Sequence, residues 1–538
     1  MANITISPKK IYLTSFFNAG YPWDKSNLKS LQIDIKAFEK LDAYAAKVTS
    51  NRSVDLLVRD LIKDAHTVLE KTRAIWIWIC HHIEYDVDGL KNEKLRSTDP
   101  DDILRTRKGV CAGYSSLFEQ MCSIAGVQCK SVSGYSKGAG YNIGQKFSGN
   151  TDHAWNAVYL NNRWHLLDST WGAGKVSENA STFNFEYDEY YFLTHPALFI
   201  GNHFPEESNW QLLESELSLE EFEQMAYLRS YFYNNGLLSV QPNKAILETV
   251  NGKATITIES RHHVLFLFQF NKTESTGLMT LTEHGMKLDV YPQKTGEHIL
   301  QIFAKRGKTN YKWALDYKIV CKSVDKNMKI PKSLRNHVGP SWLSEEAGML
   351  LPSHRDPIIN TDDGQFTVTF ALKGELDIFA TLGSDDIKIT SDMQHRHIFQ
   401  RQKKIRWNLR FEDKSNMYAT KCQYLVTCTK NTVQWPMFPL VYGCWNQDYE
   451  LIEPLEGVLP ENNNINFKFL IPGVIAVSVN GKKSFPLSLS ESGYWEGTCS
   501  TNGCQDLNVA VCKPSSPNHY NYILQYKVGK KQNWNNNV

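Results

Sequence analysis

The order of hydrophobic and polar positions divides the chain into two parts with different periods. From about Ile33 to Ala180, helical periods come first and alternating, strand-like segments follow. After about residue 240 the chain consists of short alternating segments separated by turn residues, a pattern typical of β-sandwich modules. The pattern therefore predicts an α+β domain, with helices ahead of an antiparallel sheet, followed by all-β modules.

The first part contains two helices and three strands. The stretch from His66 to Ile83 has the length and the residue types of a largely buried helix. A second helix is predicted over 111–125, where apolar residues share one face and Gly126 ends it. The glycine-rich segment 136–152 is expected to be a mobile loop. Strands are expected at 128–135, 153–160 and 163–168.

A weak repeat runs through the second part of the chain. Similar segments place Tyr317, Tyr424 and Tyr526 near the end of each repeated unit, and their spacing is close to the ~100 residues of an immunoglobulin-type sandwich. We therefore predict three such modules, with linkers near 333–342 and 432–439. The predicted division is an N-terminal extension at 1–45, the α+β domain at 46–235, and β-sandwich modules at 236–330, 331–432 and 433–538.

Composition and charge exclude several classes of function. The chain has 538 residues, of which 42% are hydrophobic and 22% charged, as in folded soluble proteins. A formal net charge of +2 gives no reason to expect nucleic acid or a membrane surface as a partner. The N-terminus lacks a secretory apolar segment, and the longest apolar run, Ala74 to Cys80, is too short to span a membrane. We therefore expect a cytoplasmic protein.

No metal or cofactor site is expected from the spacing of potential ligands. The eleven cysteines are scattered, and in a reducing compartment they should be free thiols. Cys499 and Cys504 have no second ligand pair nearby, so a hairpin turn is favoured over a zinc site. The acidic segment at Asp86 lacks the later ligands of a calcium loop and is predicted to be a helix-ending turn. His81 and His82 are adjacent, so on a helix they diverge by about 100°.

One stretch supplies the groups that cysteine chemistry requires. Cys111 begins the second helix, and the partial positive charge of a helix N-terminus favours a thiolate. A cysteine nucleophile also needs a base and a group that orients the base. The segment from Thr151 to Gly172 has the pattern of a hairpin that turns at Asn161 and Asn162, since asparagine tolerates the positive φ of tight turns.

The register of this hairpin selects a histidine. A two-residue turn places His153 opposite Thr170, so Asp168 lies one diagonal away on the same face. His165 then points to the other face of the sheet. The register therefore predicts that Asp168 orients His153 rather than His165. Whether Cys111 packs against this face is not fixed by the register.

Each of these residues also has a plain structural interpretation. A single cysteine before a helix is most often a core residue, a single histidine on a strand is usually structural, and Asp168 alone could form a turn. The presence of all three, with Gly109 and Gly113 beside the thiol, favours a catalytic site.

The sequence also resembles a known family. KGVCAGYSSLFEQMCSIAGVQCKSVSGY and DHAWNAVYLNNRWHLLDSTWG are similar to the transglutaminase-like family, whose fold is of the papain type. The similarity covers roughly residues 65–194, and it implies a triad of Cys111 as nucleophile, His153 as base and Asp168 as orienting group. It thus implies a papain-like core, which the immunoglobulin-like modules predicted above from the strand pattern would follow. The calcium-binding acidic clusters of animal transglutaminases are not evident here, so the resemblance does not extend to calcium dependence.

Flanking segments such as YPWDKSNLKSL and GYWEGTCSTNGCQ extend the resemblance to cysteine peptidases of the muscle cytoskeleton. This implies a cytoskeleton-associated thiol protease near the Z-disc that acts on cytoskeletal or sarcomeric proteins, with no cofactor. Two alternatives stay open: a largely non-catalytic scaffold that binds sarcomeric proteins, and a protein cross-linking transglutaminase. The Cys111 backbone N–H is the expected oxyanion donor, with Trp76 or Trp78 as a second donor. Oligomeric state is not predicted.

Overall fold

The chain folds into two units, Met1–Met328 and Lys329–Val538, and each is described by itself. The computed structural model describes residues 27–49, 53–177, 181–272, 276–326, 328, 337–361, 366, 368–373, 378–384, 387–391, 405–412, 418–428, 439–446, 448–517 and 519–529. Residues 1–26 of the predicted extension therefore lie outside the described residues, as do 333–336 and 432–438 of the predicted linkers.

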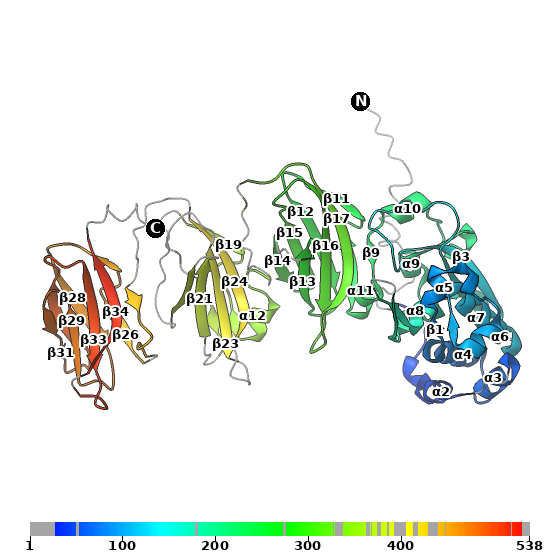
Figure 1. The fold of residues 1–538 in the computed structure, drawn as a ribbon, viewed down its shortest axis with the longest axis horizontal. Coiled ribbons are helices and arrows are strands. Elements are labelled where there is room, and N and C mark those ends of the chain that lie inside the picture. The colour runs from blue at the N-terminus through cyan, green and yellow to red at the C-terminus, as the bar shows by residue number, and fades with distance from the viewer. Residues whose placement is uncertain are drawn as a thin grey trace, which may run out of the picture. The chain divides into compact units, whose positions relative to one another are not determined.

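Two buried helices occupy the centre of the α+β part, drawn in blue and cyan in Figure 1. The first, α4 (Val68–His82), begins at Thr67, whose hydroxyl accepts from the Glu70 N–H while the Glu70 carboxylate accepts from the Thr67 N–H. The second, α7 (Cys111–Ala125), has the predicted limits and ends at Gly126, whose φ of 74° suits glycine. No helix in the described part of the chain is both long and apolar enough to cross a membrane.

The remaining helical segments of this part are short. They are η1 (Ile35–Phe38), α2 (Glu39–Ala45), α3 (Val54–Leu61), α5 (Val87–Lys91), η2 (Glu93–Leu95), α6 (Pro100–Thr106), α8 (Ser169–Ala173), η3 (Glu189–Tyr191), α9 (Pro196–Phe199), η4 (Ser208–Gln211), α10 (Leu219–Gln224) and α11 (Ser230–Asn234).

A four-stranded antiparallel sheet in the order β5-β4-β3-β8 lies beside these helices. The β4–β5 hairpin turns at Asn161 and Asn162, with φ of 49° and 63°, and its register is the predicted one. The ladder stops at Leu167, however, because Asp168 leaves the strand to cap α8. Thr170 therefore lies in α8 and not opposite His153. The strands are β3 (Cys129–Ser136), β4 (His153–Leu160), β5 (Arg163–Leu167) and β8 (His203–Pro205), with small strands β1 (Glu84–Tyr85), β2 (Lys108–Gly109), β6 (Gly174–Val176) and β7 (Phe183–Phe185).

The glycine-rich segment between β3 and β4 is an irregular loop, and side chains anchor it. Phe147 is buried in a cluster with Phe222 of α10. Lys137 is also buried, and its ammonium group donates to the carbonyl oxygens of Phe222 and Met225, the latter at 2.8 Å. The Glu223 carboxylate of α10 also accepts from the Lys146 ammonium group and from the Phe147 N–H, both at 2.7 Å. These contacts attach the loop to α10, while its mobility stays a prediction from its glycine content.

A two-sheet β module completes the first unit. Its sheets have the orders β10-β12-β15-β14 and β11-β17-β16-β13, with β9 added beside β17. Its contacts to the α+β part include an ion pair of Arg229 with Asp316 at 3.0 Å and one of Lys312 with Glu186 at 2.8 Å. The strands are β9 (Tyr227–Leu228), β10 (Leu237–Gln241), β11 (Ile246–Glu248), β12 (Ala254–Ser260), β13 (Leu265–Phe270), β14 (Gly277–Thr282), β15 (Gly285–Val290), β16 (Gly296–Lys305) and β17 (Lys312–Cys321).

The second unit contains two further groups of sheets. The first group has the order β19-β24-β23-β21-β22 beside β18-β20, with α12 (Trp342–Glu346); the second has β25-β34-β33-β29-β30, with β27 beside β34, and β26-β28-β32-β31. The strands are β18 (Met349–Leu350), β19 (Ile358–Thr361), β20 (Ala371–Leu372), β21 (Ile378–Ser384), β22 (Ile387–Ser391), β23 (Ile405–Glu412), β24 (Tyr418–Cys428), β25 (Leu440–Val441), β26 (Glu450–Glu453), β27 (Val458–Leu459), β28 (Asn464–Leu470), β29 (Ala476–Asn480), β30 (Ser484–Pro486), β31 (Ser488–Leu489), β32 (Trp495–Ser500), β33 (Asp506–Cys512) and β34 (Tyr520–Val528).

The segment from Cys499 to Cys504 connects two different sheets. It joins β32 to β33, which belong to separate sheets, so the predicted hairpin turn is wrong and the chain crosses the sandwich here. The period of two cannot distinguish these cases, because a crossing and a hairpin both need a short turn between alternating strands. Ten cysteines, all those described apart from Cys428, are free thiols.

The three repeated tyrosines share one hydrogen-bond pattern. Tyr317 on β17, Tyr424 on β24 and Tyr526 on β34 are fully buried. Their hydroxyl groups donate to backbone oxygens near the start of the same module: Pro242 at 2.9 Å, His354 at 2.7 Å and Pro454 at 3.0 Å. Each bond ties the last long strand of a module to the segment at which the chain enters that module, 70 to 75 residues earlier.

Candidate active site

Cys111 is the first residue of α7 and is half-buried. The first N–H groups of a helix have no intrahelical acceptor, and Val110, which precedes Cys111, provides no side-chain cap for them. Their partial positive charge acts on the thiol. Gly113 permits close packing at this end, because a Cβ there would meet the Ile103 side chain at 2.8 Å. The sequence thus places a thiol at an uncapped, tightly packed helix N-terminus.

Two buried hydrogen bonds fasten α7 to β4. The Ser115 hydroxyl donates to the Trp155 carbonyl oxygen at 3.0 Å, and the Asn156 amide donates to the Ser115 carbonyl oxygen at 3.0 Å. These bonds lie one turn along α7 from Cys111 and two or three residues along β4 from His153. They hold the helix that carries the sulfur against the strand that carries the imidazole.

The three predicted residues meet in the order sulfur, imidazole, carboxylate. His153 is hydrogen-bonded to the Cys111 side chain, and its Nε2 lies 2.8 Å from Oδ2 of Asp168. Nδ1 is therefore the nitrogen left for the sulfur. The Ala154 backbone N–H also donates to the Cys111 sulfur. His153 and Asp168 are both buried. This arrangement can transfer a proton between the thiol and an oriented imidazole.

Electrostatics favour the charged pair. Burial alone would raise the pKa of the Cys111 thiol, but the hydrogen bond and charge of His153 outweigh it and bring that pKa below its ordinary value. Burial would lower the pKa of His153, yet the charge of Asp168 raises it to about 10. The Asp168 carboxyl is also buried, but His153 holds its pKa well below the usual range. Near neutral pH the site therefore favours a thiolate and an imidazolium.

A second histidine, which the sequence reasoning missed, shares the carboxylate. Nε2 of His203, on β8, lies 3.0 Å from the same Oδ2 atom of Asp168. The other oxygen, Oδ1, accepts from the backbone N–H groups of Thr170 and Trp171 at 2.8 and 3.1 Å. Hydrogen bonds account for all of these contacts, so no metal ion is needed to explain them. No local motif marks His203, because it joins the site through pairing of β8 with β3.

The alternative histidine, His165, lies on the other face as predicted. Its Nδ1 is 2.6 Å from the Ser30 hydroxyl, and its Nε2 is 3.2 Å from the Leu160 carbonyl oxygen. It is fully buried, and burial lowers its pKa to about 4. His165 is therefore a structural histidine of the hairpin.

The two tryptophans expected as oxyanion donors have other partners. Trp76 donates its indole N–H to the Tyr187 hydroxyl at 3.2 Å, and Trp78 donates to the Val48 carbonyl oxygen at 2.9 Å. An indole has a single N–H, so neither residue has one left for an oxyanion in this structure. Both are core residues of α4, and the Cys111 backbone N–H is the donor that the helix start provides. Tyr85 is a further neighbour of Cys111. Burial raises the pKa of its phenol, and the Cys111 charge raises that pKa further.

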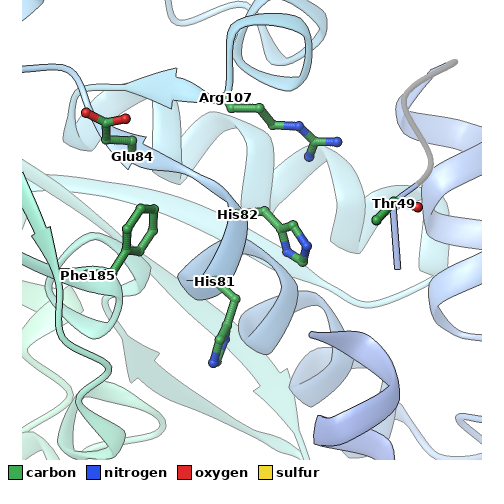
Figure 2. A pocket seen from close by; sticks show the side chains of 6 residues that line it. All are labelled: Thr49, His81, His82, Glu84, Arg107 and Phe185. Carbon is green, nitrogen blue, oxygen red and sulfur yellow. The ribbon is translucent and has the colours of Figure 1, made fainter. Parts of the chain in front are cut away.

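A hollow of about 350 Å³ lies at the end of α4, outside the triad, and Figure 2 shows the residues that line it. His81 and His82 each bring Nδ1 to a backbone oxygen four residues earlier, at 2.8 and 2.9 Å. Their rings point in different directions in Figure 2, which agrees with the expectation that they do not chelate. The hollow is lined by Thr49, His81, His82, Glu84, Arg107 and Phe185.

The acidic segment at Asp86 starts a helix and does not end one. The Asp86 carboxylate accepts from the Gly89 N–H at 2.9 Å and caps α5. The predicted helix-ending turn is therefore wrong: α4 has already ended at His82, and β1 intervenes. An aspartate in this position serves equally as a turn former and as an N-cap, which is why the sequence did not decide between them.

Comparison with known proteins identifies two family models in the chain. Residues 56–169 match the transglutaminase-like superfamily, and residues 219–332 match the KY-like, immunoglobulin-like domain. Two relatives named kyphoscoliosis peptidase, from Homo sapiens and Mus musculus, are each 49% identical over 94% of this chain and 79% of their own length. Hillarin of Drosophila melanogaster is 28% identical over 65% of this chain and 48% of its own length. The predicted combination of a transglutaminase-like α+β core and immunoglobulin-like modules is confirmed.

Proposed function

Because this chain belongs to the kyphoscoliosis peptidase family, we propose that it is a cysteine peptidase that forms a thioacyl intermediate on protein substrates. The observation that carries the proposal is the order of the three groups. The Cys111 sulfur is hydrogen-bonded to His153, and His153 Nε2 lies 2.8 Å from Oδ2 of Asp168. In this proposal Cys111 is the nucleophile, His153 the general base and acid, and Asp168 the orienting carboxylate.

The reaction takes place in two half-reactions. The Cys111 thiolate attacks the carbonyl carbon of a peptide bond, and the Cys111 backbone N–H donates to the resulting oxyanion. The imidazolium of His153 gives its proton to the leaving nitrogen, so the C–N bond breaks and a thioester remains. Water then attacks the thioester while His153 takes a proton from it, and the acid product leaves with the thiolate restored.

The test is cleavage of a purified cytoskeletal protein by the full chain, followed by mass spectrometry of new termini. Wild type should produce fragments, and Cys111→Ala should lower the rate by orders of magnitude. Cys504→Ala, which removes a half-buried thiol of another module, should cleave at the wild-type rate. Equal cleavage by wild type and Cys111→Ala would refute the assignment of the nucleophile.

We place the activity in muscle cytoplasm, at the cytoskeleton near the Z-disc, as part of the same proposal. The support is the resemblance to cytoskeletal peptidases of muscle and the family name that the relatives bear. Imaging of a tagged full chain in muscle fibres tests it: a periodic signal in register with Z-discs is expected, and a diffuse signal would contradict it.

Cross-linking follows from the same thioester if a lysine amine replaces water. The two outcomes share the nucleophile and the base, so the residues of the triad do not separate them. An added primary amine distinguishes them, because hydrolysis yields acid products and transfer yields amides that contain the amine. We propose hydrolysis as the main outcome because the relatives are named peptidases. Amine incorporation that exceeds acid formation would reverse this assignment.

A scaffold function is the second candidate, and exposed apolar residues in the last module favour it. Leu440 and Val441 on β25 are 55% and 53% exposed, and Tyr522 on the paired strand β34 is 50% exposed. Consecutive strand residues point to opposite faces, so Leu440 and Val441 expose apolar area on both faces of the edge strand β25, where a partner would bury it. Complete rescue of a muscle defect by Cys111→Ala would favour the scaffold, whereas failure of rescue would favour the enzyme.

A further inference from the structure

His203 stands out because it contacts the triad and has no role in the reaction described above. Asp168 has two carboxylate oxygens, and backbone N–H groups of α8 occupy Oδ1. His153 and His203 both approach Oδ2, at 2.8 and 3.0 Å. During turnover His153 must gain and lose a proton, so its own bond to Oδ2 changes strength. A constant donor on the same oxygen would keep the carboxylate in place.

We propose that His203 is a positioning residue of the Cys111 site, which donates its Nε2–H to Asp168 and so fixes the oxygen atom that orients His153. The proposal deepens the proposed function and rests on it for its meaning in catalysis.

The surroundings of His203 make its ring immobile. The ring is fully buried and stacks on Phe199, with ring centres 4.0 Å apart and planes at 19°. Trp171 lies 4.4 Å away on another side, and Trp155 meets it edge-on at 5.0 Å. The backbone is held as well, because His203 pairs with Ser136 of β3. A donor enclosed by three aromatic rings has one orientation available, which is what a positioning group requires.

His203 supplies a hydrogen bond without supplying a charge. Burial lowers its pKa to about 4, so the ring is neutral at neutral pH and carries a single N–H. When Nε2 holds this proton, Nδ1 is an acceptor. The Asn202 atom that lies 2.6 Å from Nδ1 is the side-chain oxygen Oδ1, and the ring also has a hydrogen bond to the Phe199 backbone. Donation from Nε2 to Asp168 therefore requires the Asn202 amide to turn by 180°, so that its N–H group donates to Nδ1. Asp168 is therefore left with one cationic partner, His153.

The other titratable groups that face Asp168 do not compete for this role. They come from four elements, and burial raises the pKa of each, so they are neutral at neutral pH: Cys80 of α4, Tyr85 of β1, Tyr114 of α7 and Tyr191 of η3. Asp152, the residue before His153, is a charged neighbour, and its carboxylate accepts from the Ser136 N–H at 2.8 Å.

The consequence concerns the protonation of His153. A neutral N–H that points at Asp168 draws part of the carboxylate charge and presents its positive end toward His153. Both effects moderate the stabilisation of the imidazolium. Removing this donor should therefore strengthen the His153–Asp168 interaction and make His153 hold its proton more tightly. Loss of one neutral hydrogen bond to the carboxylate corresponds to an upward shift of about 0.4–1.1 pH units in the His153 ionisation.

The experiment measures the ionisation of Cys111 and does not depend on turnover. The rate of Cys111 alkylation by iodoacetamide is followed by mass spectrometry from pH 4 to 11, and its upper inflection reports His153. His203→Leu should move this inflection upward by about half a unit to one unit. His203→Gln, which keeps an N–H donor, should leave it at the wild-type value. His165→Leu is the matched control. It also removes a buried neutral histidine, but this histidine is hydrogen-bonded to Ser30 and not to Asp168.

Two results would overturn the inference. One is an unchanged inflection in His203→Leu, and the other is an equal shift in His203→Gln, since a purely structural histidine would produce either. If His203→Leu does not fold, as judged by thermal unfolding, Asn202→Asp tests the same geometry. A carboxylate at Nδ1 should make His203 a cation and move the inflection downward, and no shift would refute the proposal. If the wild-type chain cleaves no amide bond, the proposed function is refuted, but the alkylation results still test the role of His203.

Discussion

Replacement of Asp168 by Asn tests the electrostatic basis of the site most directly. The change preserves size but removes the charge that raises the pKa of His153 to about 10. Without that charge, burial is left as the main influence on His153, and burial lowers its pKa. The imidazole should then be neutral at pH 7. The Cys111 thiol loses the cation that brings its pKa below the ordinary value.

The size of the effect follows from the thiolate fraction. A thiol with an ordinary pKa of about 8.5 is only about 3% ionised at pH 7, so the alkylation rate of Cys111 should fall about 30-fold in Asp168→Asn. The assay is iodoacetamide alkylation of the intact chain, with the modified site located by mass spectrometry. Asp152→Asn is the matched control: its carboxylate is exposed and bonded to the Ser136 N–H, so the rate should change little. A fall of less than threefold in Asp168→Asn would refute the assignment of a thiolate–imidazolium pair.

The same substitution should change how stability depends on pH. The folded-state pKa of His153 is raised, so its contribution to stability is complete below about 6.5 and is lost as pH rises toward 10. The folded-state pKa of Asp168 is depressed, so its contribution is complete above about 4 and is lost as pH falls below that. Wild-type stability should therefore decline at both ends of the range. Asp168→Asn should flatten both declines, and urea unfolding between pH 3 and 10 measures them.

Two further predictions concern stability away from the site. Tyr526→Phe leaves the partly buried Pro454 carbonyl oxygen without its donor and should lower the unfolding free energy of the last module by about 1 kcal/mol, whereas Tyr520→Phe, whose side chain is exposed, should have no effect in urea titrations. Arg73 is buried and pairs with Asp42 and Glu189 at 2.8 and 2.7 Å, so Arg73→Leu should destabilise the first unit by about 3–5 kcal/mol. Arg105→Leu, which removes an exposed pair with Asp102, should cost less than about 1 kcal/mol, and equal losses for the two variants would contradict the reasoning.

The hairpin that carries two of the three candidate residues could be derived from local sequence. Asparagines at 161 and 162 specify a tight turn, and a tight turn fixes the register from Leu160 and Arg163 to Asn156 and Leu167. Because register decides which side chains share a face, it separated His153 from His165 without any structure. The same reasoning carried the strand one residue too far, since Asp168 prefers to cap α8.

Contacts between distant segments were beyond such reasoning. The period of α7 gives its limits and its apolar face, but it does not state which strand that face covers. The approach of Cys111 to His153 depends on the hydrogen bonds of Ser115 and Asn156, which no spacing rule predicts. Trp76 and Trp78 failed as oxyanion donors for a related reason: their indole groups bond to Tyr187 and Val48, which lie in other parts of the chain.

Strand β3 explains how these distant segments are brought to one place. It pairs with β4 on one side and with β8 on the other, and Gly134 takes part in both ladders, opposite His153 and opposite Pro205. A Cβ at Gly134 would collide with the Phe204 carbonyl oxygen and the Trp155 ring, so only glycine allows both neighbours to approach this closely. Asp168 receives His153 from one neighbour of β3 and His203 from the other. One glycine that belongs to neither of their strands thus allows β4 and β8 to flank β3 closely, with their histidines directed at one carboxylate.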